Sequence, residues 1–146
     1  MPCILLMVLK EIIPLTQGNN LKIHLIIHKK IKGVKHLDSG IYYKILEEGI
    51  GSSPDSSHTI KVHYREWSLR HYALNRGEYS SSYDKNEPFT FKLEDVILGW
   101  QSCIPMLKRG SKALLIIPER YAYGKKNIEK HSWSSMVYEI ELIDFE

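Results

Sequence analysis

Short segments in which apolar and polar residues alternate recur along this chain, and they constrain its fold more than any other feature. Ile60 to Trp67 alternates, with Val62 and Tyr64 on the same side as Ile60, and Met136 to Phe145 alternates in the same way. A period of two residues is that of a β-strand, whose side chains point in turn to the two faces of a sheet. The chain is therefore expected to be rich in strands.

Other segments have the composition of strands, and one has that of a helix. β-Branched, aromatic and other apolar residues dominate the predicted strands, which are residues 21–27, 41–46, 89–91 and 113–117. Asn75-Arg76-Gly77 predicts a hairpin-like turn. Residues 97–107 are expected to form a short helix, with the acidic Glu94 and Asp95 at its N-terminus and Pro105 near its end. This pattern predicts an α+β fold, in which one short helix packs on one face of an antiparallel sheet.

The length of 146 residues suits one domain with a substantial core. Residues 1–37 carry six lysines against one glutamate, and a polar, basic connector is expected over 29–36. Asp38-Ser39-Gly40 interrupts the chain after it. We therefore expect a basic N-terminal extension over 1–37, which includes the strand at 21–27, and a single domain over 38–146.

Charge and hydropathy bear on the partners and the compartment. The net charge of +3 is too small to indicate nucleic-acid binding, so the extension is expected to be solvated rather than bound to an anionic partner. The apolar run Pro2 to Leu9 is shorter than the roughly 20 residues of a membrane span, and no basic residue precedes it as in a secretory signal. A cytoplasmic location is expected, with the cell envelope as the alternative if this run is a signal or anchor. Cys3 and Cys103 make no disulfide framework, which fits a reducing compartment.

The chain lacks the sequence patterns of metal, cofactor and nucleophile sites. Seven histidines are scattered, and His24 and His28 have a ligand spacing only if their segment is helical. There is no Gly-x-Ser-x-Gly elbow and no phosphate-binding glycine loop. No metal and no cofactor are expected. Aromatic residues stand out instead, either as ordinary core or as the lining of a pocket.

Several short motifs follow one another in a distinctive order. They are Val62-His63-Tyr64, Tyr79-Ser80-Ser81-Ser82, Pro88-Phe89-Thr90-Phe91, Val96-Ile97-Leu98-Gly99-Trp100, Tyr121-Ala122-Tyr123-Gly124 and the last strand, Val137 to Leu142. Their order resembles the FKBP family of peptidyl-prolyl isomerases, over about residues 39–145. The opening segment, Ser39 to Gly49, resembles in particular the bacterial macrophage-infectivity-potentiator type.

The resemblance implies a desolvated aromatic pocket that binds a prolyl ring, with Trp100 as its floor. The implied site residues are Tyr64, Tyr79, Phe89, Val96, Ile97, Trp100, Tyr123 and Tyr138. The Ile97 amide and the hydroxyls of Tyr64 and Tyr123 are expected to hold carbonyl groups. The implied partners are proline-containing unfolded or loop polypeptides, and macrolide inhibitors are candidate ligands.

The chain also departs from the family pattern. Ser80 stands where the family has Asp, and Tyr79 stands where it has Phe. Residues 128–133 lack the Ile-Pro-Pro of the usual flap, where Ile128 or Trp133 could take its place. Two hypotheses therefore stay open: an active prolyl isomerase, or an FKBP-fold chaperone or protein-binding module with little or no activity.

Overall fold

A computed structural model describes residues 27, 29–123 and 135–146 of the chain. Its strands are β1 (Lys35–His36), β2 (Tyr42–Glu47), β3 (Thr59–Ser68), β4 (Ser80–Ser81), β5 (Phe89–Lys92), β6 (Lys112–Ile117) and β7 (Met136–Phe145). Its helices are α3 (Leu69–Ala73) and α4 (Leu98–Cys103), and the short 3-10 turns are η2 (Leu93–Asp95), η3 (Ile104–Met106) and η4 (Glu119–Tyr121).

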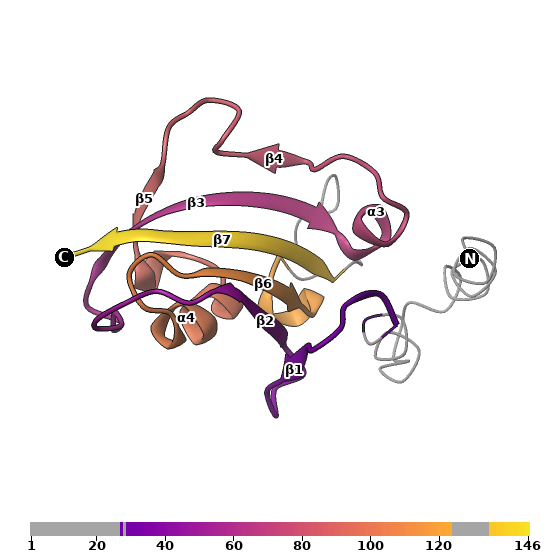
Figure 1. Cartoon of the computed structure of the whole chain (residues 1–146), viewed down its shortest axis with the longest axis horizontal. Helices are drawn as coiled ribbons and strands as arrows, with labels where there is room; N and C mark the ends of the chain where they lie inside the picture. The colour runs from indigo at the N-terminus through magenta and orange to yellow at the C-terminus, as the bar shows by residue number, and fades with distance from the viewer. Residues whose placement is uncertain (1–26, 28, 124–134) are drawn as a thin grey trace.

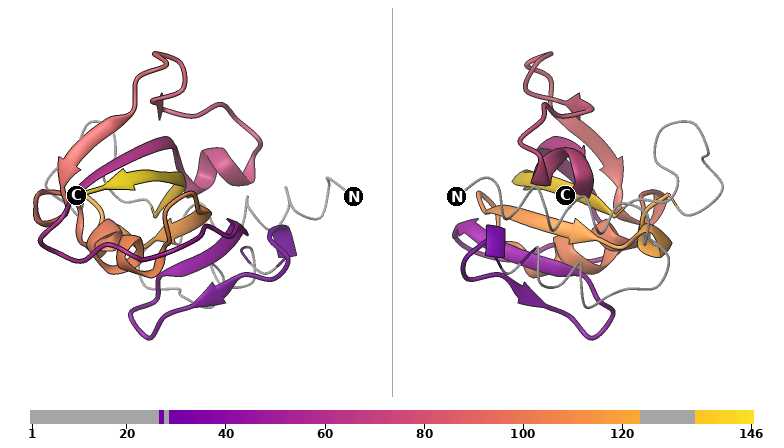
Figure 2. Two further views of the ribbon diagram at one scale, coloured as in Figure 1. Left: turned by 60° about the vertical axis from the view of Figure 1, so that its left-hand side comes forward. Right: turned by 90° about the vertical axis from the view of Figure 1, so that its right-hand side faces the viewer.

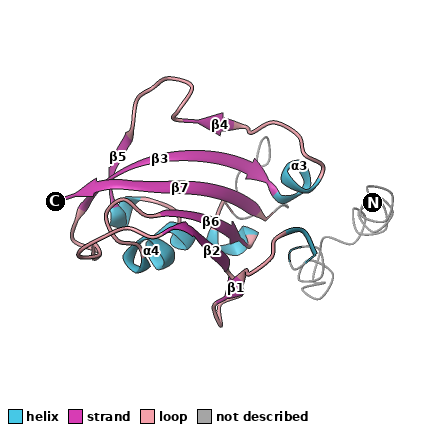
Figure 3. Ribbon diagram, viewed as in Figure 1, coloured by secondary structure: helices cyan, strands magenta, loops and turns pink. Residues whose placement is uncertain are grey.

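The strands form one antiparallel sheet in the order β1-β2-β6-β7-β3-β4, and β5 also pairs with β3 (Figures 1 and 3). β5 pairs with residues 59–62 of β3, and β4 pairs with residues 65 and 66. One edge of β3 thus carries two short strands, while its other edge pairs with β7 over nearly its whole length.

The α4 helix packs on one face of this sheet and encloses the larger core with it (Figure 2). The alternation of β3 and β7 explains which residues face the helix, since Val62 lies opposite Leu142 and Tyr64 lies opposite Ile140. The helix and η3 contribute Trp100, Cys103 and Ile104, all buried. We call this the helix-side core.

Gly99 allows α4 to approach the sheet closely. A Cβ atom at this position would lie 2.5 Å from Cδ1 and from Cγ2 of Ile117, which is buried on β6. Real Cβ contacts are longer than this, so any larger residue would push the helix away from β6. The glycine therefore sets the depth at which the neighbouring Trp100 sits.

A second apolar cluster covers the other face of the sheet. Ile27, Ile31 and Val34 of the N-terminal segment are buried in it, together with the strand residues Trp67, Leu114, Ile116 and Val137. Successive residues of β6 therefore face different cores, because Leu115 belongs to the helix-side core and Leu114 and Ile116 belong to this cluster. Burial on both faces explains why β6 is continuously apolar.

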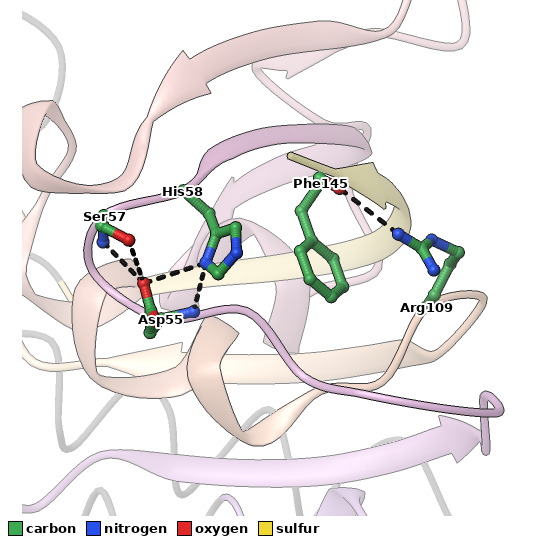
Figure 4. A network of polar contacts seen from close by, with 5 residues as sticks. All are labelled: Asp55, Ser57, His58, Arg109 and Phe145. Atoms are coloured by element: carbon green, nitrogen blue, oxygen red, sulfur yellow. Dashed lines mark hydrogen bonds and ion pairs between the residues drawn. The ribbon is translucent and has the colours of Figure 1, made fainter.

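Two loops contact the end of β7, one through Arg109 and one through the ring of His58 (Figure 4). Arg109 donates from Nε to Asp144 Oδ1 at 2.7 Å and from Nη2 to the Phe145 carbonyl at 3.3 Å. The His58 ring meets Phe145 edge-on at 5.0 Å, and the Ser57 amide donates to Asp55 at 2.8 Å. Hydrogen bonds from Ser57 lower the pKa of the Asp55 carboxyl.

The predicted α+β class is confirmed, and the strands at 41–46, 60–67, 89–91, 113–117 and 136–145 are found within a residue or two of their expected bounds. The helix α4 begins at Leu98, one residue after its expected start, but it ends at Cys103, and only the 3-10 turn η3 continues toward the expected end at 107. The acidic residues Glu94 and Asp95 do not lie at its N-terminus, because they belong to η2, and Val96, with extended backbone, follows them. The helix α3, which follows β3 directly, was not expected.

The structure tests only some of the predictions for the N-terminal segment. Residues 21–26 lie outside the described residues, and Ile27 is helical, not extended. Within the expected connector, residues 29 and 30 are helical and Lys35–His36 forms β1. This segment is ordered because its apolar residues Ile31 and Val34 pack on the sheet. The boundary near residue 38 stays a prediction. No helix in the described ranges has the length and apolar character to cross a bilayer.

Candidate functional site

Four aromatic rings surround the indole of Trp100. Ring centroids lie 5.7 Å away for Tyr64, 6.5 Å for Phe89, 5.4 Å for Phe91 and 5.2 Å for Tyr138. All four rings are tilted or edge-on to the indole, which are the favoured geometries of aromatic pairs. We call these five residues the aromatic group.

The sheet register brings the aromatic group together from distant parts of the sequence. Tyr64 lies on β3, which pairs with β5 on one edge and with β7 on the other. β5 carries Phe89 and Phe91, β7 carries Tyr138, and α4 places Trp100 beneath them. The structure therefore places four of the predicted site residues, Tyr64, Phe89, Trp100 and Tyr138, next to one another; that they form the binding site stays a prediction.

Burial changes across the aromatic group. Trp100 is 5% exposed and Tyr138 is fully buried, whereas Phe89 is 43% exposed. The group thus extends from the interior to the surface, which a ligand-binding apolar site requires. The Trp100 Nε1 atom is buried and has no hydrogen-bond partner in the part of the chain that the structure describes. Unpaired buried donors are rare in native proteins and commonly mark functional sites.

Hydroxyl groups line the β4 side of this group. The hydroxyls of Tyr64 and Ser80 share a hydrogen bond of 3.1 Å. Ser80 therefore contacts the aromatic group at the position where the family pattern would place a carboxylate.

A buried carboxyl group was missed by the sequence reasoning. Glu66 is 6% exposed, and its Oε1 accepts hydrogen bonds of 2.8 Å from both Tyr123 and Tyr138. The two tyrosine hydroxyls are themselves 3.2 Å apart. Glu66 lies two residues after Tyr64, so the strand alternation already indicated that both face α4. We call Glu66, Tyr123 and Tyr138 the carboxyl–tyrosine network.

The network keeps both phenols protonated. Burial and, next, the negative charge of Glu66 raise the pKa of Tyr138 well above the usual value of a phenol. Burial raises the pKa of Tyr123 as well, and Glu66 adds to the shift. Both tyrosines are therefore hydrogen-bond donors to the carboxyl group at any physiological pH.

The remaining predicted site residues, Val96, Ile97 and Tyr79, belong neither to the aromatic group nor to the carboxyl–tyrosine network. Val96 and Ile97 are partly buried against the helix-side core. Their carbonyls accept hydrogen bonds from Gln101 Nε2 at 2.8 Å and from the Trp100 amide at 3.0 Å. Tyr79 donates to Ser68 Oγ at 3.1 Å, and its ring meets His71 edge-on at 4.6 Å; none of its described ring contacts is with the aromatic group.

Some predicted features fall outside the described residues, namely Gly124 and the flap residues Ile128 and Trp133. The histidine pair His24 and His28 also falls outside them. Within the described ranges, no three His, Cys, Asp or Glu side chains are grouped closely enough to hold a metal ion.

Comparison with known proteins matches residues 51–143 to the family model of FKBP-type peptidyl-prolyl cis-trans isomerases. The chain is 35% identical over 116 residues to the FKBP-type isomerase FkpA of Escherichia coli, covering 79% of this chain and 41% of FkpA. It is 36% identical over 99 residues to the isomerase Mip of Coxiella burnetii, covering 68% of this chain and 41% of Mip. The chain thus spans less than half the length of these curated relatives.

Solved structures agree with the sequence comparison. The crystal structure of Escherichia coli FkpA superposes with a TM-score of 0.76 at 31% identity, over 90% of this chain and 59% of that one. A peptidyl-prolyl isomerase from Pseudomonas syringae gives 0.71 at 30% identity, over 87% of this chain and 93% of that one. With the family model, the fold and the order of the motifs in agreement, the chain belongs to the FKBP-type peptidyl-prolyl cis-trans isomerase family.

Proposed function

We propose that this chain is a peptidyl-prolyl cis-trans isomerase that accelerates rotation about X-Pro bonds in polypeptide substrates. The observation that carries the proposal is the aromatic group, which leads from the half-exposed Phe89 to the buried indole of Trp100 in a chain of this family.

The chemistry requires no nucleophile. Rotation about a peptide bond meets a barrier of about 18–20 kcal/mol, because resonance gives the C–N bond partial double-bond character. Twisting removes this resonance and makes the amide less polar. An apolar, water-free environment therefore stabilises the twisted amide relative to the planar one, and such preferential binding of the transition state is catalysis.

The substrate needs a hydrogen-bond donor to hold its carbonyl group. We assign this role to the backbone amide of Ile97, which directly precedes α4, and to the hydroxyl of Tyr64. We do not assign the role of carbonyl donor to Tyr123, because its single hydroxyl hydrogen is donated to Glu66.

Exchange NMR on an Ala-Leu-Pro-Phe peptide tests the activity, and Phe89→Ala tests the site. The Phe89 ring is 43% exposed but contacts Tyr64, Phe91 and Trp100, so the stability of the variant is measured beside its activity. Loss of an aromatic contact costs about 0.5–1.5 kcal/mol, so we expect kcat/KM per folded molecule to fall about two- to tenfold. Leu98→Ala is the matched control, since Leu98 is 54% exposed on α4 and lies outside the aromatic group.

Two results would count against this proposal. Wild-type protein that gives no rate gain at micromolar concentration is not an isomerase of this peptide. If the wild-type protein without isomerase activity still bound unfolded polypeptide, and Trp100→Ala bound it equally well, the chaperone or binding-module hypothesis would replace the isomerase proposal. Equal effects of Phe89→Ala and Leu98→Ala would place catalysis elsewhere.

The substrates follow from the same proposal. Proline-containing unfolded or loop segments are the proposed substrates. Binding of macrolides such as tacrolimus is a separate prediction, which a titration of the tryptophan fluorescence would check, with Trp100→Phe as the control. The absence of nucleic-acid binding and a cytoplasmic location, with the cell envelope as its alternative, remain predictions.

A further inference from the structure

Glu66 is a buried acid with no cationic side chain bound to it among the described residues. It is more than nine-tenths buried, and among the described residues it takes part in no salt bridge. Buried charges in proteins are normally paired with an opposite charge or bound to a metal, since an unpaired one costs several kcal/mol. Its two hydrogen-bond donors among the described residues are neutral phenols, and neither supplies a positive charge.

The carboxyl group faces the aromatic group. Tyr64 and Glu66 lie on the same face of β3, and the register sets Glu66 opposite Ser80 on one side and opposite Tyr138 on the other. Tyr138 donates to Glu66 at 2.8 Å while its ring contacts the indole of Trp100 at 5.2 Å. One tyrosine side chain therefore separates the carboxyl group from the proposed floor of the site.

The network can accept further hydrogen bonds but has no hydrogen left to donate to a ligand. The hydroxyl hydrogens of Tyr123 and Tyr138 are both directed at Oε1 of Glu66. Oε2 of Glu66 makes no hydrogen bond to any described residue, and a carboxylate oxygen is an acceptor only. A ligand group that meets this end of the site must therefore be a donor, and a cationic donor also compensates the charge.

We propose that Glu66 is a specificity-determining residue that favours prolyl segments with lysine or arginine beside the proline. The proposal rests on the proposed isomerase function. A lysine or arginine beside the proline has a long flexible stem, and in this proposal its charged end passes Tyr138 to the carboxyl group while the prolyl ring occupies the aromatic group.

The test compares peptides on the unaltered protein. Ala-Lys-Pro-Phe and Ala-Leu-Pro-Lys each carry a cation on one side of the proline, and norleucine in place of lysine supplies the same stem without the charge. Isomerisation is measured by exchange NMR, and the Kd of each peptide is measured by titration of the indole resonances. We expect kcat/KM or 1/Kd to favour at least one lysine peptide over its norleucine counterpart about tenfold.

Two variants assign any preference to Glu66. Glu66→Gln keeps the shape and still accepts from both tyrosines but removes the charge, so the lysine preference should fall to about onefold. Glu139→Gln removes the same charge from β7, where residue 139 lies opposite Arg65 on the other face of the sheet, and it should keep the full preference. Circular dichroism confirms that both variants are folded.

Each outcome either supports or overturns the role proposed for Glu66. No lysine preference on either side of the proline in the wild-type protein overturns the inference, and so does a preference that Glu66→Gln retains. If the protein isomerises no peptide, the proposed function fails, and the Kd values alone then decide whether Glu66 selects cations. A loss of preference in Glu66→Gln but not in Glu139→Gln supports the proposal.

Discussion

The single cysteine of α4 shows how strongly burial controls the chemistry of one residue. Cys103 is fully buried, and burial raises the pKa of its thiol to about 12. The thiolate is the reactive form, so the folded protein should keep this thiol inert. In a Cys3→Ala background, we expect iodoacetamide at pH 8 to label Cys103 at least about a hundredfold more slowly than in urea. Rapid labelling without denaturant would contradict the buried position.

The aromatic residues of the site could be predicted from the sequence, and Glu66 could not. Tyr64, Phe89, Trp100 and Tyr138 were expected together because their motifs occur in the family order, and the register confirms that they meet. The hydrogen-bond partners of Glu66 lie 57 and 72 residues away in the sequence, and no pattern near Glu66 indicates them. Alternation tells which face of a strand a side chain takes, but not whether that face is covered at that point.

At the scale of elements, the contact between α4 and β6 depends on Gly99. Gly99→Ala puts a Cβ atom 2.5 Å from Ile117, and overpacking of this kind typically costs about 1–3 kcal/mol. Alanine is the better helix former by about 1 kcal/mol, so we expect a net loss of up to about 2 kcal/mol in the free energy of unfolding by urea. Lower isomerase activity should accompany it, because Trp100 is the next residue.

Gly77→Ala is the control for this prediction, since a Cβ atom there meets nothing within 4 Å. A double mutant with Ile117→Ala should be more stable than the sum of the two single losses implies, because the second substitution removes the crowded atoms. Strict additivity would show that the helix does not press on Ile117.

Element types proved easier to predict than element ends. β7 was found at its expected bounds because ten alternating residues leave one consistent assignment. The acidic pair Glu94 and Asp95 was misplaced, because acidic residues favour the first turn of any helix. Here they sit in η2, which Val96 and Ile97 separate from α4. The helix α3 was missed because it has only five residues and directly follows the strand β3, so it has no periodic pattern of its own.

At the scale of the whole molecule, the second apolar cluster makes the N-terminal segment part of the fold. Ile31 is buried against the face of the sheet opposite α4, so Ile31→Ala should lower the free energy of unfolding by about 2–4 kcal/mol. The aromatic group lies on the other face, so kcat/KM per folded molecule should not change. Urea denaturation and exchange NMR on the same samples check both expectations.

Ile50→Ala is the control, because Ile50 is 87% exposed and its loss should change stability by less than about 0.5 kcal/mol. If Ile31→Ala were equally harmless, the N-terminal segment would not contribute to stability. If it abolished activity in the folded protein, the two faces of the sheet would be coupled.

The strand order also dictates when such a molecule can be finished during its synthesis. β7 is delivered last of the seven strands, yet it sits between β6 and β3 and brings Tyr138 to the indole. Until β7 has been synthesised, the edges of β3 and β6 that it pairs with stay unpaired and part of the apolar surface stays uncovered, a state prone to association with other chains. Because β7 pairs with the distant β3, this topology predicts that the sheet closes late in folding.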